Sequence, residues 1–270
     1  MDQFIISNQA GDQIMDAEEW FKHAPPKKGI KQWCDGYSAK ELAKSWTTGG
    51  PHVPLELEAL FKSHEYTQRL TIERVMAEVK TDLDCFGGPR NHDLVLIGHD
   101  NKCQRIVACI EAKARESFGK IITEELRIAE SKKSSNAPTR IHNLSKAIFG
   151  CEPNDHIKTL RYQLLYALAG TLIEAQRQNA TMAVFIVHEF VDDASDSSVI
   201  ANGQDFASFF HSFPGVTKDA FTLGQLYGPI QAACKVESCK VPTKLSCLFG
   251  KCQTIIPKYI GKNPASAVTR

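Results

Sequence analysis

The sequence lacks three features that would assign it to a broad class of proteins. It contains no run of about 18 consecutive apolar residues, so no membrane-spanning helix and no membrane partner are expected. Its first residues, Met1-Asp2-Gln3, are acidic and precede only a short apolar run, which argues against a signal peptide and predicts a cytoplasmic protein. A large net charge is also absent, since 32 Lys and Arg balance 31 Asp and Glu. A nucleic-acid-binding function would therefore need a local basic patch.

What the sequence does have is the composition of an ordinary globular protein. Hydrophobic residues make up 43% and charged residues 23% of its 270 residues, which is enough for a domain with a complete core. Nine cysteines are present, which is an odd number. Without a secretion signal, these cysteines are better interpreted as free thiols or metal ligands than as disulfides.

The most informative segment covers residues 88–119 and is predicted to form a β-hairpin. Asp93 precedes an apolar run, a turn-rich Gly, Asp and Asn segment follows, and a second apolar run ends in Glu111-Ala112-Lys113. Two apolar runs joined in this way are typical of a hairpin. Asp93 and Glu111 are therefore expected to meet at its open end. The two-residue period of a strand places Glu111 and Lys113 on one face and Ala112 on the other.

This arrangement predicts a divalent-metal site for phosphodiester hydrolysis. Two carboxylates can bind Mg²⁺ or Mn²⁺ while leaving positions open for water and a phosphate. A lysine two residues further on can position the attacking water or neutralise developing negative charge. The alternative is an ordinary surface ion pair, because Glu-x-Lys also occurs at Glu78 and Glu130. Only Glu111 combines the motif with an upstream Asp and two apolar strands.

Asp93 and the Glu111-Ala112-Lys113 motif resemble the PD-(D/E)XK phosphodiesterase superfamily, the restriction-endonuclease-like nucleases. The wider pattern over residues 38–188 is also similar to an uncharacterised bacterial family within that superfamily. The resemblance implies that Asp93, Glu111 and the backbone carbonyl of Ala112 hold the metal. It also implies that Lys113 positions the attacking water.

The same resemblance suggests two further site residues. The first core helix of the superfamily often contributes an acid, which suggests Glu58 in the helix predicted over residues 55–64. Exonuclease-type branches carry a Gln-x-x-x-Tyr motif on a later helix, which suggests Gln163, although Tyr166 comes one residue early here. The plainer alternatives are a solvated helix acid for Glu58 and a capping or sheet-packing amide for Gln163. The sequence departs from the superfamily pattern at Arg90-Asn91-His92, where the superfamily name expects a proline.

The order of the predicted elements favours an α/β fold with a mixed sheet and a restriction-endonuclease-like α-β-β-β-α-β core. The elements after the helix over residues 55–64 are a strand over 70–80, the two hairpin strands, helices over 118–133 and 157–178, and a strand over 180–188. Residues 1–53 are expected to form a partly helical arm packed on the core. Residues 54–230 are expected to form the nuclease-like domain, and residues 231–270 a Cys-rich basic tail in the same globule.

The tail carries two cysteine pairs whose spacing is compatible with a zinc site. Four residues separate Cys234 from Cys239, and four separate Cys247 from Cys252, as tetrahedral Zn²⁺ allows. The alternative is a set of buried or reactive thiols. From residue 235 to 270, seven Lys and Arg accompany a single Glu. Such a basic tail can lie along a phosphate backbone, or it can be an ordinary solvated surface.

A second basic series near the predicted site makes Arg115, Lys120 and Arg161 candidates for binding nucleic acid. We therefore expect a Mg²⁺-dependent nuclease acting on DNA, in restriction, defence or repair. The alternative is a non-catalytic nucleic-acid-binding or assembly module on a nuclease-like fold, with or without a structural zinc. Many proteins of the resembled superfamily act as dimers because one site cuts one strand, so the resemblance also raises the prospect of a homodimer.

Overall fold

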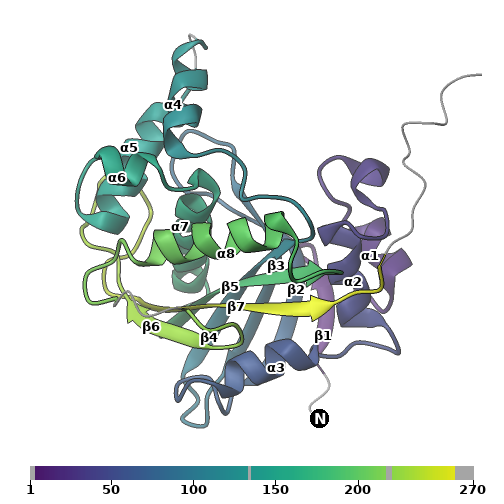
Figure 1. Ribbon diagram of the computed structural model, residues 1–270. Coiled ribbons are helices and arrows are strands. Elements are labelled where there is room, and N and C mark those ends of the chain that lie inside the picture. The colour runs from purple at the N-terminus through teal and green to yellow at the C-terminus, as the bar shows by residue number, and fades with distance from the viewer. Residues whose placement is uncertain (1–3, 133–134, 217–220, 259–270) are drawn as a thin grey trace, which may run out of the picture.

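The computed structural model describes residues 4–132, 135–216 and 221–258. Its strands are β1 (Ile5–Asn8), β2 (Thr71–Thr81), β3 (Arg90–His99), β4 (Arg105–Lys113), β5 (Met182–Val191), β6 (Leu226–Ile230) and β7 (Ser246–Ile255). Its helices are α1 (Ala17–His23), the 3-10 helix η1 (Gly29–Gln32), α2 (Ser38–Thr47), α3 (Leu55–Lys62), α4 (Ile122–Glu130), α5 (Ala137–Phe149), α6 (Asp155–Lys158), α7 (Tyr162–Arg177) and α8 (Ser197–Phe210). These elements make a mixed α/β fold, which confirms that part of the prediction (Figure 1). No helix within the described ranges is long and apolar enough to cross a membrane.

The strands of the described residues form one mixed sheet with the order β1-β2-β3-β4-β5-β7-β6. β2, β3 and β4 make an antiparallel meander, whereas β5 and β7 run parallel to β4. The C-terminal ends of β2, β4, β5 and β7 therefore lie along one edge of the sheet, which we call the C-terminal edge. In open α/β sheets, ligands bind outside the C-terminal ends of the parallel strands.

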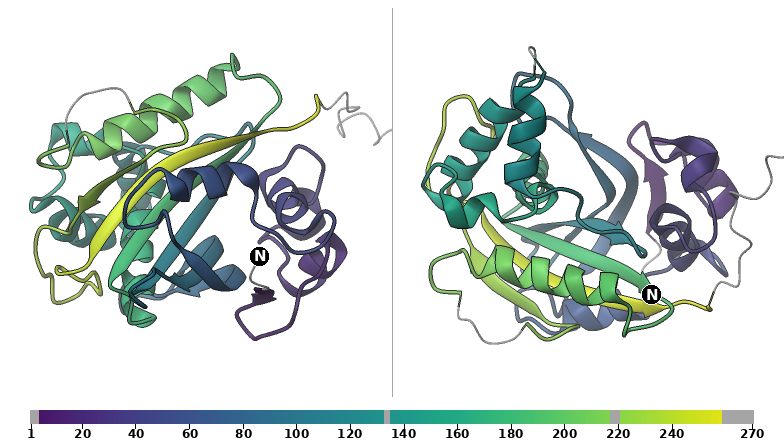
Figure 2. Two further views of the ribbon diagram at one scale, coloured as in Figure 1. Left: turned by 90° about the horizontal axis from the view of Figure 1, so that it is seen from below. Right: turned by 45° about the horizontal axis from the view of Figure 1, so that its top comes forward.

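The sheet separates two hydrophobic cores, and different parts of the chain cover its two faces. The helices from α4 (Ile122–Glu130) onward pack on one face, which we call the α7 face. The helices α1, α2 and α3 pack on the other, which we call the α3 face (Figures 1 and 2). Strand β4 alternates between them, since Val107 and Cys109 point to the α7 face while Ile106 and Ala108 point to the α3 face.

Both the predicted arm and the predicted tail contribute strands to the sheet. Residues 1–53 supply the edge strand β1, which pairs with β2. Residues 231–270 supply β7, which lies between β5 and β6. The apolar pattern of β7 is hard to recognise in the sequence because the polar side chains of Lys251 and Gln253 interrupt it. The part of the basic tail after residue 258 lies outside the described residues.

The helix predicted over residues 157–178 is in fact two helices. α6 ends at Lys158 and α7 begins at Tyr162 because the chain between them pairs with the segment before α4. The carbonyl of Leu160 accepts a hydrogen bond from Ile122 N at 2.9 Å, which ends the helical pattern. α5 has no counterpart among the predicted elements, since its first residues lie in a Ser-, Asn- and Pro-containing stretch typical of a loop. Pro138 nevertheless fits the first turn of a helix.

Candidate functional site

The β3–β4 hairpin brings Asp93 and Glu111 to its open end, as the sequence predicted. The register pairs Leu94 with Ile110, one position away from the two acids. Asp93 Oδ2 accepts a hydrogen bond from the backbone N–H of Ala112 at 2.7 Å. This bond holds the Asp93 carboxyl group against the end of β4, at the C-terminal edge of the sheet.

Lys113 and Glu111 lie side by side on the α7 face and are almost completely buried, with 4% and 3% of their surfaces exposed. Lys113 Nζ donates a hydrogen bond to Glu111 Oε1 at 2.8 Å. Gln163, in the first turn of α7, donates to the same oxygen, and its Oε1 accepts from Lys113 Nζ at 3.2 Å. Asp93, Glu111, Lys113 and Gln163 are therefore brought together, while the side chain of Ala112 joins the core of the α3 face.

Arg90 is a further member of this cluster that the sequence did not predict. Its guanidinium donates to the second oxygen of Glu111, Oε2, and lies over the ring of Tyr166, 5.1 Å from the ring centre. Gly170 on α7 permits this close approach, because a Cβ atom there would lie 2.9 Å from Arg90 Cγ. In the sequence, Arg90 stands out only as the start of the segment that replaces the superfamily's proline.

Glu78 on β2 adds a third carboxyl group to the site. The β2–β3 register pairs its two neighbours with the residues on either side of Asp93. Glu78 has a φ of 53°, a left-handed conformation that is uncommon outside glycine. The strand alternation reverses there, since Ala77 packs in the α3-face core and Val79 in the α7-face core. Strained backbone of this kind is concentrated at functional sites.

The sequence did not predict Glu78 as a site residue, because no carboxylate precedes it on a hairpin arm. The signal that identifies it is the alignment of β2 with β3, which places Glu78 across from Asp93. Asn91, two residues before Asp93 on β3, donates a hydrogen bond to Glu78 Oε2. The additional acid of this site therefore comes from the first strand of the meander and not from the preceding helix.

The three carboxyl groups have different proton affinities because different charges surround them. Burial raises the pKa of Asp93 to about 7, and the negative charge of Glu111 adds to this shift. Burial, followed by the charge of Asp93, raises the pKa of Glu78 to about 8. Burial acts on Glu111 in the same direction, but Arg90 and Lys113 outweigh it and lower the pKa of Glu111 to about 2. At neutral pH, Glu111 is ionised whereas Asp93 and Glu78 retain much of their protons.

Replacing Glu78 with glutamine is expected to change how stability depends on pH. Because folding raises the pKa of Glu78, its stabilising contribution is present below the ordinary glutamate pKa of 4.5 and is lost as the pH rises through about 8. In EDTA, Glu78→Gln should therefore gain melting temperature relative to wild type at about pH 8.5 but not at about pH 4. Thermal unfolding at both pH values measures this. The exposed Glu130→Gln is the matched control, and equal shifts for the two variants would contradict the expectation.

Asp93 and Glu111 fit the way Mg²⁺ is commonly held in proteins, by one or two carboxylates completed with water and substrate phosphate. Burial and the neighbouring carboxyl groups keep protons on Asp93 and Glu78 near neutral pH, so a cation bound here would favour loss of these protons. In the described ranges, no group of three or more His, Cys, Asp or Glu side chains is arranged to hold a metal ion.

The chain matches one family model over a range that contains the whole of this cluster. Residues 13–253 match the model of a family described as a domain of unknown function, DUF6946. The chain belongs to this family. The matched range includes every clustered side chain, from Glu78 on β2 to Tyr166 on α7. Searches of curated proteins and of solved structures returned no match for this DUF6946 chain.

One predicted acid of this DUF6946 protein is not brought to the site. Glu58 lies on α3, where Lys62 Nζ is 3.4 Å from its Oε2. α3 packs on the opposite face of the sheet from Glu111 and Lys113. The assignment of Glu58 is therefore corrected, because the helix before the meander covers the α3 face while the acids of the hairpin face α7.

The four C-terminal cysteines do not gather into a zinc site, which corrects that prediction. Cys247 and Cys252 both lie on β7, but strand alternation sends Cys247 to the α7-face core and Cys252 to the α3-face core. Cys234 donates to the carbonyl of Lys146, at the end of α5, and Cys239 packs against the α7-face core. The regular spacing of the four cysteines suggested that they bind one zinc ion, but β7 directs Cys247 and Cys252 to opposite faces of the sheet.

Two of the three basic residues predicted to contact nucleic acid are already paired with acids. Arg115 forms an ion pair with Asp192, and Arg161 Nε lies 2.8 Å from an oxygen of Asp205. Lys120 is exposed in the loop between β4 and α4, and its carbonyl accepts from the first residue of α7. The backbone of Lys120 therefore lies beside the start of α7, next to the residue that precedes Gln163.

Proposed function

We propose that this DUF6946 protein is a metal-dependent nuclease that hydrolyses phosphodiester bonds of DNA with Mg²⁺ or Mn²⁺. The observation that carries the proposal is the convergence of Asp93, Glu111 and Lys113 at the C-terminal edge of the sheet. The order α3, β2, β3, β4, α7 and β5 supports it, with α4, α5 and α6 as additional helices between β4 and α7. This order agrees with the α-β-β-β-α-β core of the restriction-endonuclease-like proteins that the sequence motif resembles.

Asp93 and Glu111 are the residues that would hold the metal, with the backbone carbonyl of Ala112 as a third ligand. A bound Mg²⁺ would polarise a phosphate oxygen and lower the pKa of a water molecule. Asp93 suits this role because the hydrogen bond from Ala112 N–H to Oδ2 orients its carboxyl group at the end of β4. Glu78 has a raised pKa of about 8, so it would add negative charge beside the metal only after losing its proton.

Lys113 acts in this proposal as a charged hydrogen-bond donor. The pKa of Lys113 is raised because the attraction of Glu111 outweighs the opposing effect of burial. An ammonium group that keeps its proton can donate to the attacking water or to a phosphate oxygen and stabilise negative charge as it develops. Glu111 and Gln163 hold its Nζ in place through hydrogen bonds of 2.8 and 3.2 Å.

A non-catalytic nucleic-acid-binding or assembly module is the second candidate, and one observation favours it. Both oxygens of Glu111 are already engaged, Oε2 by Arg90 and Oε1 by Lys113 and Gln163. A buried network of this kind can be retained for structural specificity alone. This candidate predicts DNA binding that weakens with salt and is not followed by cleavage.

A cleavage assay with divalent metals separates the two candidates. The full chain is incubated with linear, circular and single-stranded DNA, and with RNA, in Mg²⁺, in Mn²⁺ or in EDTA. The nuclease proposal expects products only with a metal present. Salt-dependent binding without cleavage of any substrate in either metal would favour the module and overturn the nuclease.

Asp93→Asn is expected to lower the cleavage rate by at least about a hundredfold, because an uncharged amide is a weaker ligand for a hard cation. Part of the loss should be recovered at high metal concentration, so rates are measured across a Mg²⁺ titration. The exposed Asp155→Asn, at the start of α6, is the matched control. Equal rates for the two variants would remove Asp93 from the metal site.

A further inference from the structure

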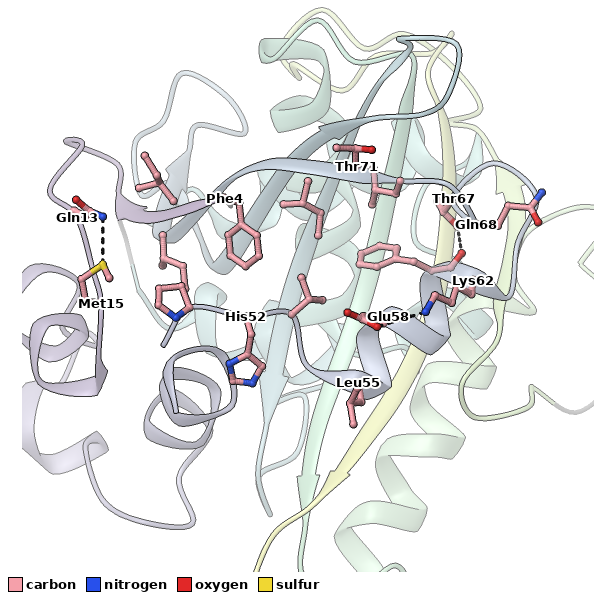
Figure 3. A pocket seen from close by; sticks show the side chains of 17 residues that line it. Phe4, Gln13, Met15, His52, Leu55, Glu58, Lys62, Thr67, Gln68 and Thr71 are labelled. Carbon is pink, nitrogen blue, oxygen red and sulfur yellow. Dashed lines mark hydrogen bonds and ion pairs between the residues drawn. The ribbon is translucent and has the colours of Figure 1, made fainter. Parts of the chain in front are cut away.

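A recess on the α3 face is separate from the proposed active site. Its volume is about 690 Å³, within the range of roughly 300–1,000 Å³ found for small-molecule sites. Its walls come from β1, the loop before α3, α3 itself and the start of β2 (Figure 3). Glu111 and Lys113 point to the α7 face, so the sheet lies between the recess and the acid cluster.

The walls of the recess are mainly apolar, and packing holds them in place. Ile6 and Phe61 are buried core residues, and Val53 packs against the same core. Apolar side chains also remain in contact with water around the recess, at Ile5, Met15 and Leu55. Covering this surface would be favourable by about 25 cal/mol for each Å² removed from water.

The polar lining carries no net charge, which restricts the ligand. Glu58 and Lys62, one turn apart on α3, form an ion pair and supply the formal charges of the lining. Nucleic acids and anionic membranes are recognised by clustered Lys and Arg, which this recess does not offer. Its 17 lining residues are also fewer than the roughly 20–30 that a stable protein interface uses on each side.

We propose that the recess binds an uncharged, mainly apolar small molecule that carries a polar end group. The apolar body would lie against Phe61 and Val53. Figure 3 shows Lys62, Thr67 and Gln68 at one end of the recess. Thr67 is buried and its hydroxyl donates to the carbonyl of Phe61, so Lys62 and Gln68 are the groups there that can hydrogen-bond the polar group. The site faces away from the acid cluster, so binding there is a property additional to the proposed nuclease activity.

The probe for this site is N-phenyl-1-naphthylamine, an uncharged apolar dye whose fluorescence rises in apolar surroundings. The full chain is expected to bind it saturably, with one dye molecule per chain. Val53→Trp fills the recess and should weaken binding by at least about tenfold. Leu55→Glu is a second variant that preserves folding, because this side chain is 78% exposed. It places a charge on the apolar rim and should also weaken binding.

Ile30→Glu is the matched control, because Ile30 is 66% exposed and lies outside the recess. Weaker binding by Val53→Trp and Leu55→Glu, with wild-type binding by Ile30→Glu, supports the proposal. Absence of saturable fluorescence, or equal binding by all three variants, overturns it. Neither outcome depends on whether the protein cleaves DNA.

Discussion

Replacing Lys113 with methionine is expected to reduce metal-dependent cleavage by about a thousandfold. Methionine keeps most of the apolar stem but removes the charge that Glu111 and Gln163 hold in place. The loss should fall on turnover at saturating DNA, because a buried ammonium contributes little to the long-range attraction of a polyanion. Single-turnover rates and DNA affinity, measured in parallel, separate these two effects.

Lys102→Met is the matched control, since Lys102 is exposed in the turn at the other end of the same hairpin. Its cleavage rate should equal that of wild type. Circular dichroism must show that Lys113→Met is folded at the assay temperature, because Glu111 loses one of its buried partners. A folded Lys113→Met that binds DNA and cleaves it at the wild-type rate would contradict the role of this lysine.

Replacing Arg90 with methionine is expected to destabilise the protein by about 3–5 kcal/mol. Arg90 and Glu111 are both buried, and the substitution leaves the Glu111 carboxylate with less compensating positive charge inside the α7 face. A change of this size should lower the melting temperature by roughly 10 °C for a chain of this length. Thermal unfolding in EDTA, followed by circular dichroism, measures it without interference from metal binding.

Arg115→Met is the control for this stability effect. Arg115 also forms an ion pair, with Asp192, but its side chain is 41% exposed, and exposed pairs contribute about 0–1 kcal/mol. The double variant Arg90→Met/Glu111→Gln should recover part of the lost stability, because the unpaired buried charge is gone. Similar melting temperatures for Arg90→Met and Arg115→Met would show that the Arg90–Glu111 pair contributes little.

The sequence by itself determined the hairpin and the pairing of its two acids. Asp93, the turn and Glu111 belong to one continuous segment, so local patterns of apolar and turn residues set how its strands align. The two-residue period then placed Glu111 beside Lys113 without reference to the rest of the chain. The α/β class could also be predicted from the sequence, because the apolar residues of its strands and helices recur with clear periods.

Only the tertiary structure decided which distant residues join the site. The position of Glu78 at the site depends on the alignment of β2 with β3. The position of Arg90 depends on its close approach to α7, which Gly170 allows. The exclusion of Glu58 and the separation of Cys247 from Cys252 depend on which face of the sheet each side chain occupies. A shift of one residue in a strand exchanges its two faces, and packing across the whole sheet selects between them.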